Sequence, residues 1–134
     1  MKFGEEALDA LRAYLEGLVP YAGSLVRFRE GIEKDPEGES ADRAFELDVQ
    51  TILPASTYGE RYTLIGLLIV RYWPTGFRSE DVNRAVNDSL FLYDALLRFR
   101  DYALVPVDTA IEPADEEEPM DRLVLAWIMN VRRS

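Results

Sequence analysis

Two long apolar runs restrict the folds that this chain can adopt. Residues 61–73 read RYTLIGLLIVRYW and residues 122–132 read RLVLAWIMNVR, so each run is apolar at both odd and even positions. Neither run approaches the roughly 20 apolar residues of a membrane-spanning helix. A shorter run that is apolar on both sides is typical of a strand inside a sheet or beneath a second subunit. The two runs therefore predict central strands of a covered sheet.

Two further segments are expected to pair with these runs. Residues 103–111 predict a strand that forms a hairpin with 122–132, and Pro106 places that strand at an edge or a bulge because proline donates no ladder hydrogen bond. Residues 43–53 predict a strand with one wet face that forms a hairpin with 61–73. The alternation in 43–53 sets apolar Phe45, Leu47 and Val49 against polar Glu46, Asp48 and Gln50.

Two segments have the period of a helix. Residues 4–18 place Leu8, Leu11, Leu15 and Leu18 on one face, at steps of three and four. Residues 79–99 predict a second helix with Ser79 as its N-cap. From Leu90 onward this helix is apolar nearly all round, which predicts burial on more than one side, as at a subunit interface. Its predicted buried face consists of Val82, Ala85, Val86, Ser89, Tyr93 and Leu96 or Leu97.

The remaining segments complete a single domain. Residues 25–32 are ambiguous and favour a short edge strand, and residues 33–42 form a polar loop rich in turn formers. The chain contains no internal repeat and no linker, so we expect one α+β domain over residues 1–134. The expected order is α-β-β-β-α-β-β, a two-layer sandwich of two helices on an antiparallel or mixed sheet.

The composition excludes several kinds of chemistry. The 134 residues include no histidine and no cysteine, which rules out Ser-His-Asp triads, thiolate nucleophiles and cysteine-ligated zinc. No phosphate-binding glycine motif is present, and the first residues do not resemble a signal peptide. A net charge of −10 argues against a protein whose main partner is the phosphate backbone of nucleic acid. We expect neither an enzyme nor a cofactor.

Two pairs of carboxylates are candidates for carrying chemistry. Glu46 and Asp48 lie two apart on the wet face of a predicted strand, where they could hold a metal or act as acid and base. An ordinary solvated face, with pairing to Arg61 or Arg71, is the favoured interpretation. Asp81 and Asp88 share a helix face, and we expect them to form surface pairs with Arg84.

The hairpin loop 112–121 carries six acidic residues among ten. We expect a solvated, disordered tip. The sharper alternative is an electrostatic contact, either with a basic partner or with a passage whose walls must repel DNA. Clustered carboxylates are oxygen ligands of the kind that calcium prefers, but their spacing here is not that of an EF-hand. The candidate interaction residues are the acidic tip, two tryptophans and the terminal arginines: Asp115, Glu116, Glu117, Glu118, Trp73, Trp127, Arg132 and Arg133.

Three stretches together resemble the tail-terminator and tail-completion proteins of long-tailed bacteriophages. They are RYTLIGLLIVRYWPTGFRSEDVNRAVNDSLFLYDALLRF, then ALVPVDTAI, then RLVLAWIMNVRRS. The helix predicted from ALDALRAYLEGLVPYAG fits the same layout, so the resemblance covers most of the chain. It is a resemblance of pattern and size, because this family has no signature motif.

The resemblance implies a small α+β subunit that assembles with copies of itself into a ring, typically a hexamer. Such a ring caps the tail tube, stops its growth and joins it to the head. The implied partners are the tail-tube protein and a head-completion protein, with no membrane and no catalytic residue. The implied location is the virion tail, assembled in the host cytoplasm. DNA would pass without specific binding, and the negative charge of the chain suits such a passage.

Two alternatives belong to other classes. The order of elements and the acidic composition also resemble type III secretion chaperones, which are homodimers that bind an extended effector segment. Those proteins usually finish with a further helix, whereas this sequence finishes on a predicted strand. An acidic inhibitor that mimics nucleic acid would need carboxylates arrayed over a surface, and one acidic loop does not supply that array.

Overall fold

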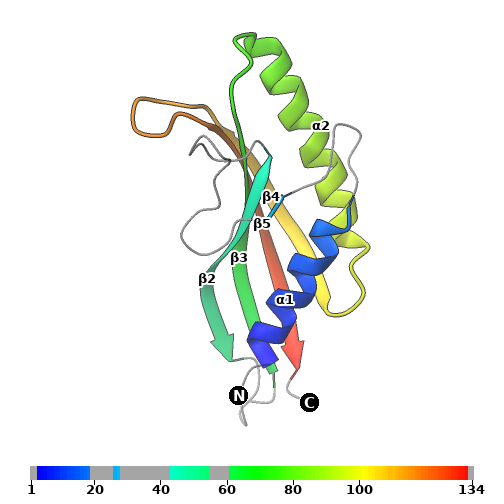
Figure 1. Cartoon of the computed structure of the whole chain (residues 1–134). Helices are drawn as coiled ribbons and strands as arrows, with labels where there is room; N and C mark the ends of the chain where they lie inside the picture. The colour runs from blue at the N-terminus through cyan, green and yellow to red at the C-terminus, as the bar shows by residue number, and fades with distance from the viewer. Residues whose placement is uncertain (1–2, 19–25, 28–42, 55–60, 133–134) are drawn as a thin grey trace.

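The α+β class is confirmed, with two helices packed on a four-stranded antiparallel sheet (Figure 1). The computed structural model describes residues 3–18, 26–27, 43–54 and 61–132. The elements within these ranges are α1 (Phe3–Glu16), β1 (Val26–Arg27), β2 (Ala44–Pro54), β3 (Arg61–Tyr72), α2 (Arg78–Leu97), β4 (Ala103–Glu112) and β5 (Asp121–Arg132).

The four antiparallel strands lie in the order β2-β3-β5-β4, and β1 lies beside β2 as a short fifth strand, which gives the order β1-β2-β3-β5-β4. Both predicted hairpins, β2–β3 and β4–β5, are present, and β3 and β5 pair with each other over their whole length, from Arg61 opposite Arg132 to Tyr72 opposite Asp121. The prediction that the two apolar runs are central strands is therefore confirmed. The two-residue β1 pairs in parallel with β2 at the sheet edge. The rest of segment 25–32 and the loop 33–42 fall outside the described residues.

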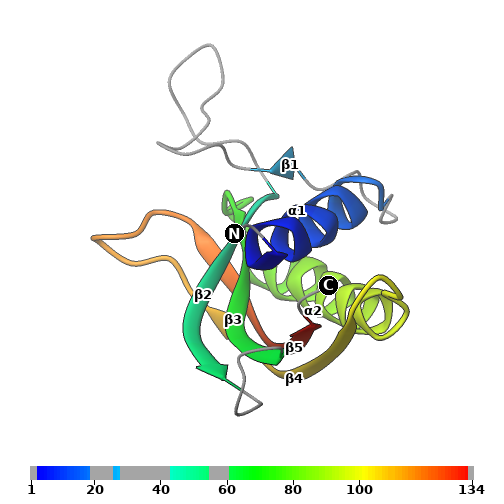
Figure 2. The ribbon, with the colours of Figure 1, turned by 90° about the horizontal axis from the view of Figure 1, so that it is seen from below.

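Both helices cover the same side of the curved sheet (Figure 2). On that side, alternate residues of β3 and β5 are buried, including Leu68, Leu125 and Trp127. Apolar residues of α1, such as Leu11 and Leu15, complete the core, as the leucine spacing predicts. The apolar residues that alternate along the strands and those on one face of α1 thus pack together in one core.

Pro106 occupies the position that its chemistry predicts. It lies in β4, which forms an edge of the sheet, and the register shifts between Pro106 and Asp108. Edge and bulge, the two predicted alternatives, are both found. A proline and a bulge together make this edge a poor template for an additional strand.

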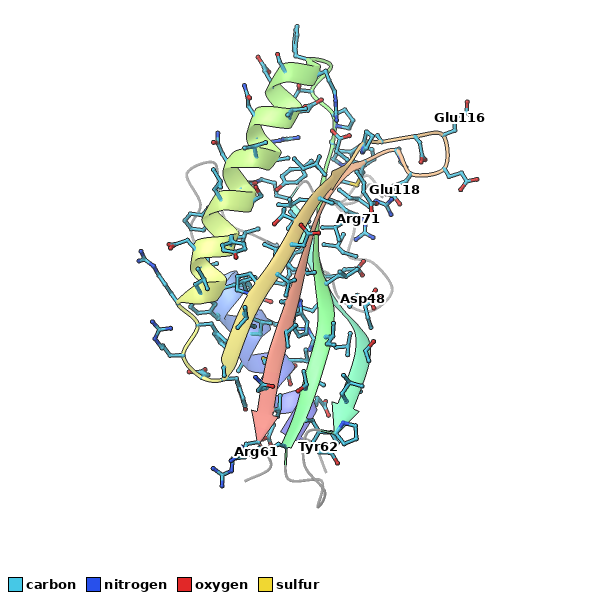
Figure 3. The ribbon with its side chains drawn as sticks, turned by 180° about the vertical axis from the view of Figure 1, so that it is seen from behind. Asp48, Arg61, Tyr62, Arg71, Glu116 and Glu118 are labelled. Atoms are coloured by element: carbon cyan, nitrogen blue, oxygen red, sulfur yellow. The ribbon has the colours of Figure 1, made fainter. Side chains whose placement is uncertain are left out.

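The opposite side of the sheet has no helix over it in the described part of the chain (Figure 3). We call its apolar centre the outer sheet face. Its side chains are half-buried or exposed rather than fully buried, so the described elements cover β5 fully on one side only. The outer sheet face consists of Ile65, Leu67 and Ile69 of β3, Val124, Ala126 and Ile128 of β5, and Val105 of β4.

The predicted start of the second helix is wrong. The N-cap is Phe77, which forms no side-chain cap, and Ser79 lies inside the helix. Thr75 replaces the cap, because its hydroxyl accepts a bond from the Phe77 backbone N–H and donates one to Asp81. Hydrogen bonds of Thr75 and Asp81, which lie on either side of the predicted cap residue Ser79, therefore stabilise the start of the helix.

The predicted buried face of α2 is also partly wrong. Val86 and Tyr93 are exposed, and Val82 and Ser89 are only half-buried. Compared with the prediction, the helix is rotated about its axis, because Asp81 and Asp88 point inward, where they have polar partners. The residues that α2 buries are Asp81, Ala85, Asp88, Leu92, Ala95 and Leu96. Neither described helix is long and apolar enough to span a membrane.

Candidate functional site

The acidic loop is an ordered turn built on Asp115. Its Oδ1 accepts hydrogen bonds from the backbone N–H groups of Glu117 (2.9 Å) and Glu118 (2.7 Å), and its own N–H donates to the Glu118 carbonyl. The N–H of Glu118, then that of Glu117, lowers the pKa of the Asp115 carboxyl. The loop is solvated as expected, but the expectation of a disordered tip is not met. Glu116 stands at its outer end (Figure 3).

The acidic residues at the base of the loop are engaged with the body of the protein. Asp121 is 4% exposed, accepts a hydrogen bond from the Ala114 N–H and pairs with Arg78 at 3.2 Å. Glu112 pairs with Arg122. The acidic surface of the loop is consequently smaller than its six acidic residues suggest, because Glu112 and Asp121 are paired with arginines.

Arg71 connects the two hairpins. Its guanidinium lies 2.9 Å from Glu46 and 3.9 Å from Glu118, so one side chain ties β2 to the acidic loop (Figure 3). The predicted pairing of Glu46 with Arg71 is confirmed. Asp48 instead accepts a hydrogen bond from the Gln50 side chain. Within the described residues, no group of three or more acidic side chains could hold a metal ion.

A closed polar cluster lies between β2, β3 and α2. Arg43 and Asp88 are 4% and 1% exposed, and the Arg43 Nε donates to Asp88 Oδ2 at 3.0 Å. A second Arg43 nitrogen binds Oδ1, and the Tyr72 hydroxyl donates to Oδ2 at 2.8 Å. Arg43 adopts a φ of 60°, a backbone conformation that bulky side chains rarely occupy. The cluster holds the start of β2 against the helix.

Tyr72 acts only as a hydrogen-bond donor in this cluster. Burial, and then the negative charge of Asp88, raises the pKa of its hydroxyl. A tyrosine in this setting stays protonated at any ordinary pH. The hydrogen bonds of this cluster therefore join β3 and the start of β2 to α2.

The predicted pairing with Arg84 is confirmed for Asp81, whose carboxylate lies 3.9 Å from the guanidinium, but both carboxylates are buried rather than at the surface. Asp88 binds Arg43, and Asp81 accepts from the Thr75 N–H and hydroxyl at 2.9 Å and 2.8 Å. Arg84 lies 3.9 Å from Asp81, donates to the Trp73 carbonyl and stands 4.9 Å from the centre of the Tyr72 ring. The hydrogen-bond partners of the two carboxylates, Arg43 and Thr75, lie outside the helix, so helix spacing could not reveal them.

The predicted interaction residues do not form one site. Trp127 is fully buried in the core of its own chain, where it is not available to a partner. Trp73 is half-buried at the end of β3. Arg132 is exposed at the far end of β5 from the acidic loop, about 35–40 Å away along twelve strand residues. Arg133 lies outside the described residues.

A shallow hollow of about 310 Å³ lies between the start of α2 and the base of the acidic loop. Its carboxylates already have partners, because Asp81 is bound to Thr75 and Asp121 to Ala114 and Arg78. The hollow is open, and the exposed Arg78 side chain lies at its edge. It is lined by Pro74, Gly76, Arg78, Asp81, Pro113, Ala114 and Asp121.

The described residues also present two apolar surfaces. The first is the outer sheet face. The second is a stripe on α2, which we call the α2 ridge, formed by Val86, Leu90, Tyr93 and Leu97, with exposed fractions of 39%, 66%, 39% and 47%. Their spacing of four, three and four residues places them on one face of the helix. Sequence reasoning found the apolar character of this helix but assigned part of the ridge to the core.

No protein-family model matches the chain, and no curated protein matches it in sequence. The fold and these surfaces are therefore the basis on which a function is proposed.

Proposed function

We propose that this chain is a structural subunit of a long-tailed bacteriophage, which assembles into a ring that caps the tail tube and joins it to the head. The outer sheet face carries the proposal. Monomeric proteins rarely leave a continuous apolar patch across the centre of a sheet, since covering that patch with a partner is favourable. A second subunit would bury the side of β3 and β5 that the helices leave uncovered.

The chemistry of the chain supports a structural role. Several of the described charged groups form ion pairs that hold the fold together, such as Arg43 with Asp88 and Arg71 with Glu46. In the shallow hollow between α2 and the acidic loop, both lining carboxylates, Asp81 and Asp121, are already bound within the protein. An assembly subunit needs surfaces rather than a catalytic pocket.

The charge distribution fits a ring around DNA. The net charge is −10, and the acidic turn at Asp115 projects from the end of the β4–β5 hairpin (Figure 3). Like charges repel, so an acidic ring lets a nucleic acid move through its channel without binding it. Glu116 and Glu117 also provide a contact for a basic surface on the tube or the head.

Two measurements test this function. Mass photometry of the purified protein is expected to show a closed oligomer, with six copies as the expected number. Deleting its gene from the replicon that encodes it is expected to give tails of uncontrolled length, because tube growth loses its stop. A stable homodimer that binds an extended segment of a secreted protein, together with tails of normal length after deletion, would instead favour the chaperone-like alternative.

A further inference from the structure

We propose that successive copies join head to tail, with the α2 ridge of one copy packed on the outer sheet face of the next. The inference rests on the proposed ring in taking the partner to be another copy of this chain. It adds the two surfaces that meet and the symmetry of their contact.

The α2 ridge points away from its own sheet. Ala85, Leu92 and Leu96 face the core, and the ridge residues Leu90 and Leu97 lie close to the opposite side of the helix at 100° per residue. None of the exposed residues between Val82 and Tyr93 is charged, although 30% of the chain is charged. Depletion of charge is the compositional mark of an interface core.

The outer sheet face has the same character. Ile65, Leu67 and Ile69 alternate along β3 beside Val124, Ala126 and Ile128 of β5, and Val105 of β4 extends the patch. Charged side chains on this side of the sheet lie around the patch, with Arg71 and Arg122 at one end of β3 and β5. An apolar centre with a polar rim is the usual anatomy of a protein interface.

The two surfaces match in shape and extent. The ridge is convex and runs about 17 Å from Val86 to Leu97. The patch extends about 13 Å from Ile65 to Ile69 and about 10 Å between β3 and β4. Packing of a helix on a sheet is already the architecture within each copy, so the proposed contact repeats that layer arrangement between copies.

The rims of the two surfaces are complementary in charge. Asp48 on β2 and Asp108 on β4 are exposed at the two sides of the outer sheet face. Arg98 and Arg100 are exposed at the C-terminal end of the ridge. Arg98 pairs with Asp94 on its own helix, but this pair is largely exposed and contributes little, so the arginine can exchange its partner.

The positions of the two surfaces decide the symmetry. They lie on opposite layers of the sandwich, so a two-fold dimer that joins two outer sheet faces would leave both ridges in water. A head-to-tail contact uses both surfaces of every copy, and it forms a ring when the rotation between copies closes. A closed ring leaves neither surface exposed.

Two variants with one exposed substitution each test the contact. Leu90→Glu alters the ridge, and Val105→Glu alters the outer sheet face at a residue that is 54% exposed, so both chains are expected to fold. Each variant alone is expected to self-associate at least about tenfold more weakly, because a buried unpaired carboxylate disrupts an interface core. Ala13→Glu on α1 and Ile52→Glu on β2 are matched controls away from both surfaces and are expected to assemble like the wild type.

Mixing the two variants gives the decisive result. One intact ridge and one intact outer sheet face remain in the mixture, so a one-to-one heterodimer is expected in mass photometry, with circular dichroism of each variant showing a native fold. Loss of assembly for Val105→Glu with none for Leu90→Glu would overturn the proposal in favour of a two-fold dimer. Unchanged assembly of both, or a wild type that stays monomeric at all concentrations, would also overturn it.

The result is separable from the function itself. If the two variants behave as expected while gene deletion leaves tail length normal, the contact stands and the phage function fails. If deletion gives overlong tails while both variants still assemble, the function stands and this contact is wrong.

Discussion

Gly66 and Trp127 face each other across the β3–β5 ladder, and the glycine makes room for the indole ring. A Cβ atom at position 66 would lie 2.6 Å from Cζ2 of Trp127 and 2.6 Å from the backbone carbonyl oxygen of Asp48. The register of β2 shifts between Val49 and Thr51, beside this glycine. The largest side chain of the core thus depends on the absence of a side chain on the neighbouring strand.

Gly66→Ala is expected to destabilise the fold by about 3 kcal/mol, near the upper end for an added methyl group in a packed core. The cost is high because one of the two obstacles is backbone, which cannot rotate away. Urea denaturation followed by circular dichroism measures the change. Gly4→Ala is the matched control, since nothing lies within 4 Å of its added Cβ, and it is expected to cause no loss. Equal stability of both variants would contradict the close approach at Gly66.

Asp88→Asn is expected to destabilise the protein by about 3 kcal/mol, because it leaves the Arg43 guanidinium as an unpaired charge in the interior. Combining it with Arg43→Met removes that charge while asparagine can still accept the Tyr72 hydrogen bond. The double variant is therefore expected to unfold at a higher urea concentration than Asp88→Asn alone. A double variant that is less stable than the single one would show that Arg43 contributes chiefly through other contacts.

The strands were predictable from sequence because their burial has a local signature. In 43–53 and in the two apolar runs, alternate residues lie on opposite faces of a strand, so sequence position alone assigns a residue to a face. Pro106 indicates an edge or a bulge because proline has no backbone N–H to donate. These signals need no knowledge of the rest of the chain. They were sufficient for the class, the two hairpins and the central position of β3 and β5.

The orientation of α2 was not predictable because it depends on distant partners. Asp88 is buried only because Arg43, 45 residues earlier, supplies a bidentate partner, and a carboxylate in a helix is otherwise read as a surface residue. The same applies to Asp81, whose partner Thr75 precedes the helix. Because these two carboxylates point inward, Leu90 and Tyr93 point outward. The α2 ridge could therefore not be predicted from the helix sequence alone.

Stability is expected to fall in acid partly through Asp81. The Thr75 backbone N–H, and less strongly its hydroxyl, lowers the pKa of this carboxyl. A lowered folded-state pKa means stability that is present above the ordinary aspartate pKa of about 3.9 and lost as pH falls through the lower folded-state value. Wild type is therefore expected to exceed Asp81→Asn in thermal midpoint at pH 7, with the difference shrinking below about pH 4.

Thr75→Val refines the acid experiment, since it removes the hydroxyl bond and keeps the backbone N–H. We expect its pH profile to lie between those of wild type and Asp81→Asn, closer to wild type because the backbone bond has the larger effect. A constant difference between wild type and Asp81→Asn from pH 7 to pH 3 would show that this carboxyl does not contribute to the acid response.

The acidic turn is held by hydrogen bonds to Asp115, although its composition alone predicts a disordered loop, and this difference can be tested. Asp115→Ala removes the acceptor of the Glu117 and Glu118 N–H groups, so hydrogen exchange of these two amides is expected to accelerate. Glu116→Gln with Glu117→Gln is the matched control, because it removes charge from exposed side chains and leaves Asp115 in place. Both variants are expected to keep the unfolding free energy within about 1 kcal/mol of wild type, since the turn lies outside the core. Wild-type amides at 117 and 118 that exchange as fast as those of an unfolded peptide would show that the turn does not persist in solution, and the projecting carboxylates would then be a flexible tether rather than a shaped contact.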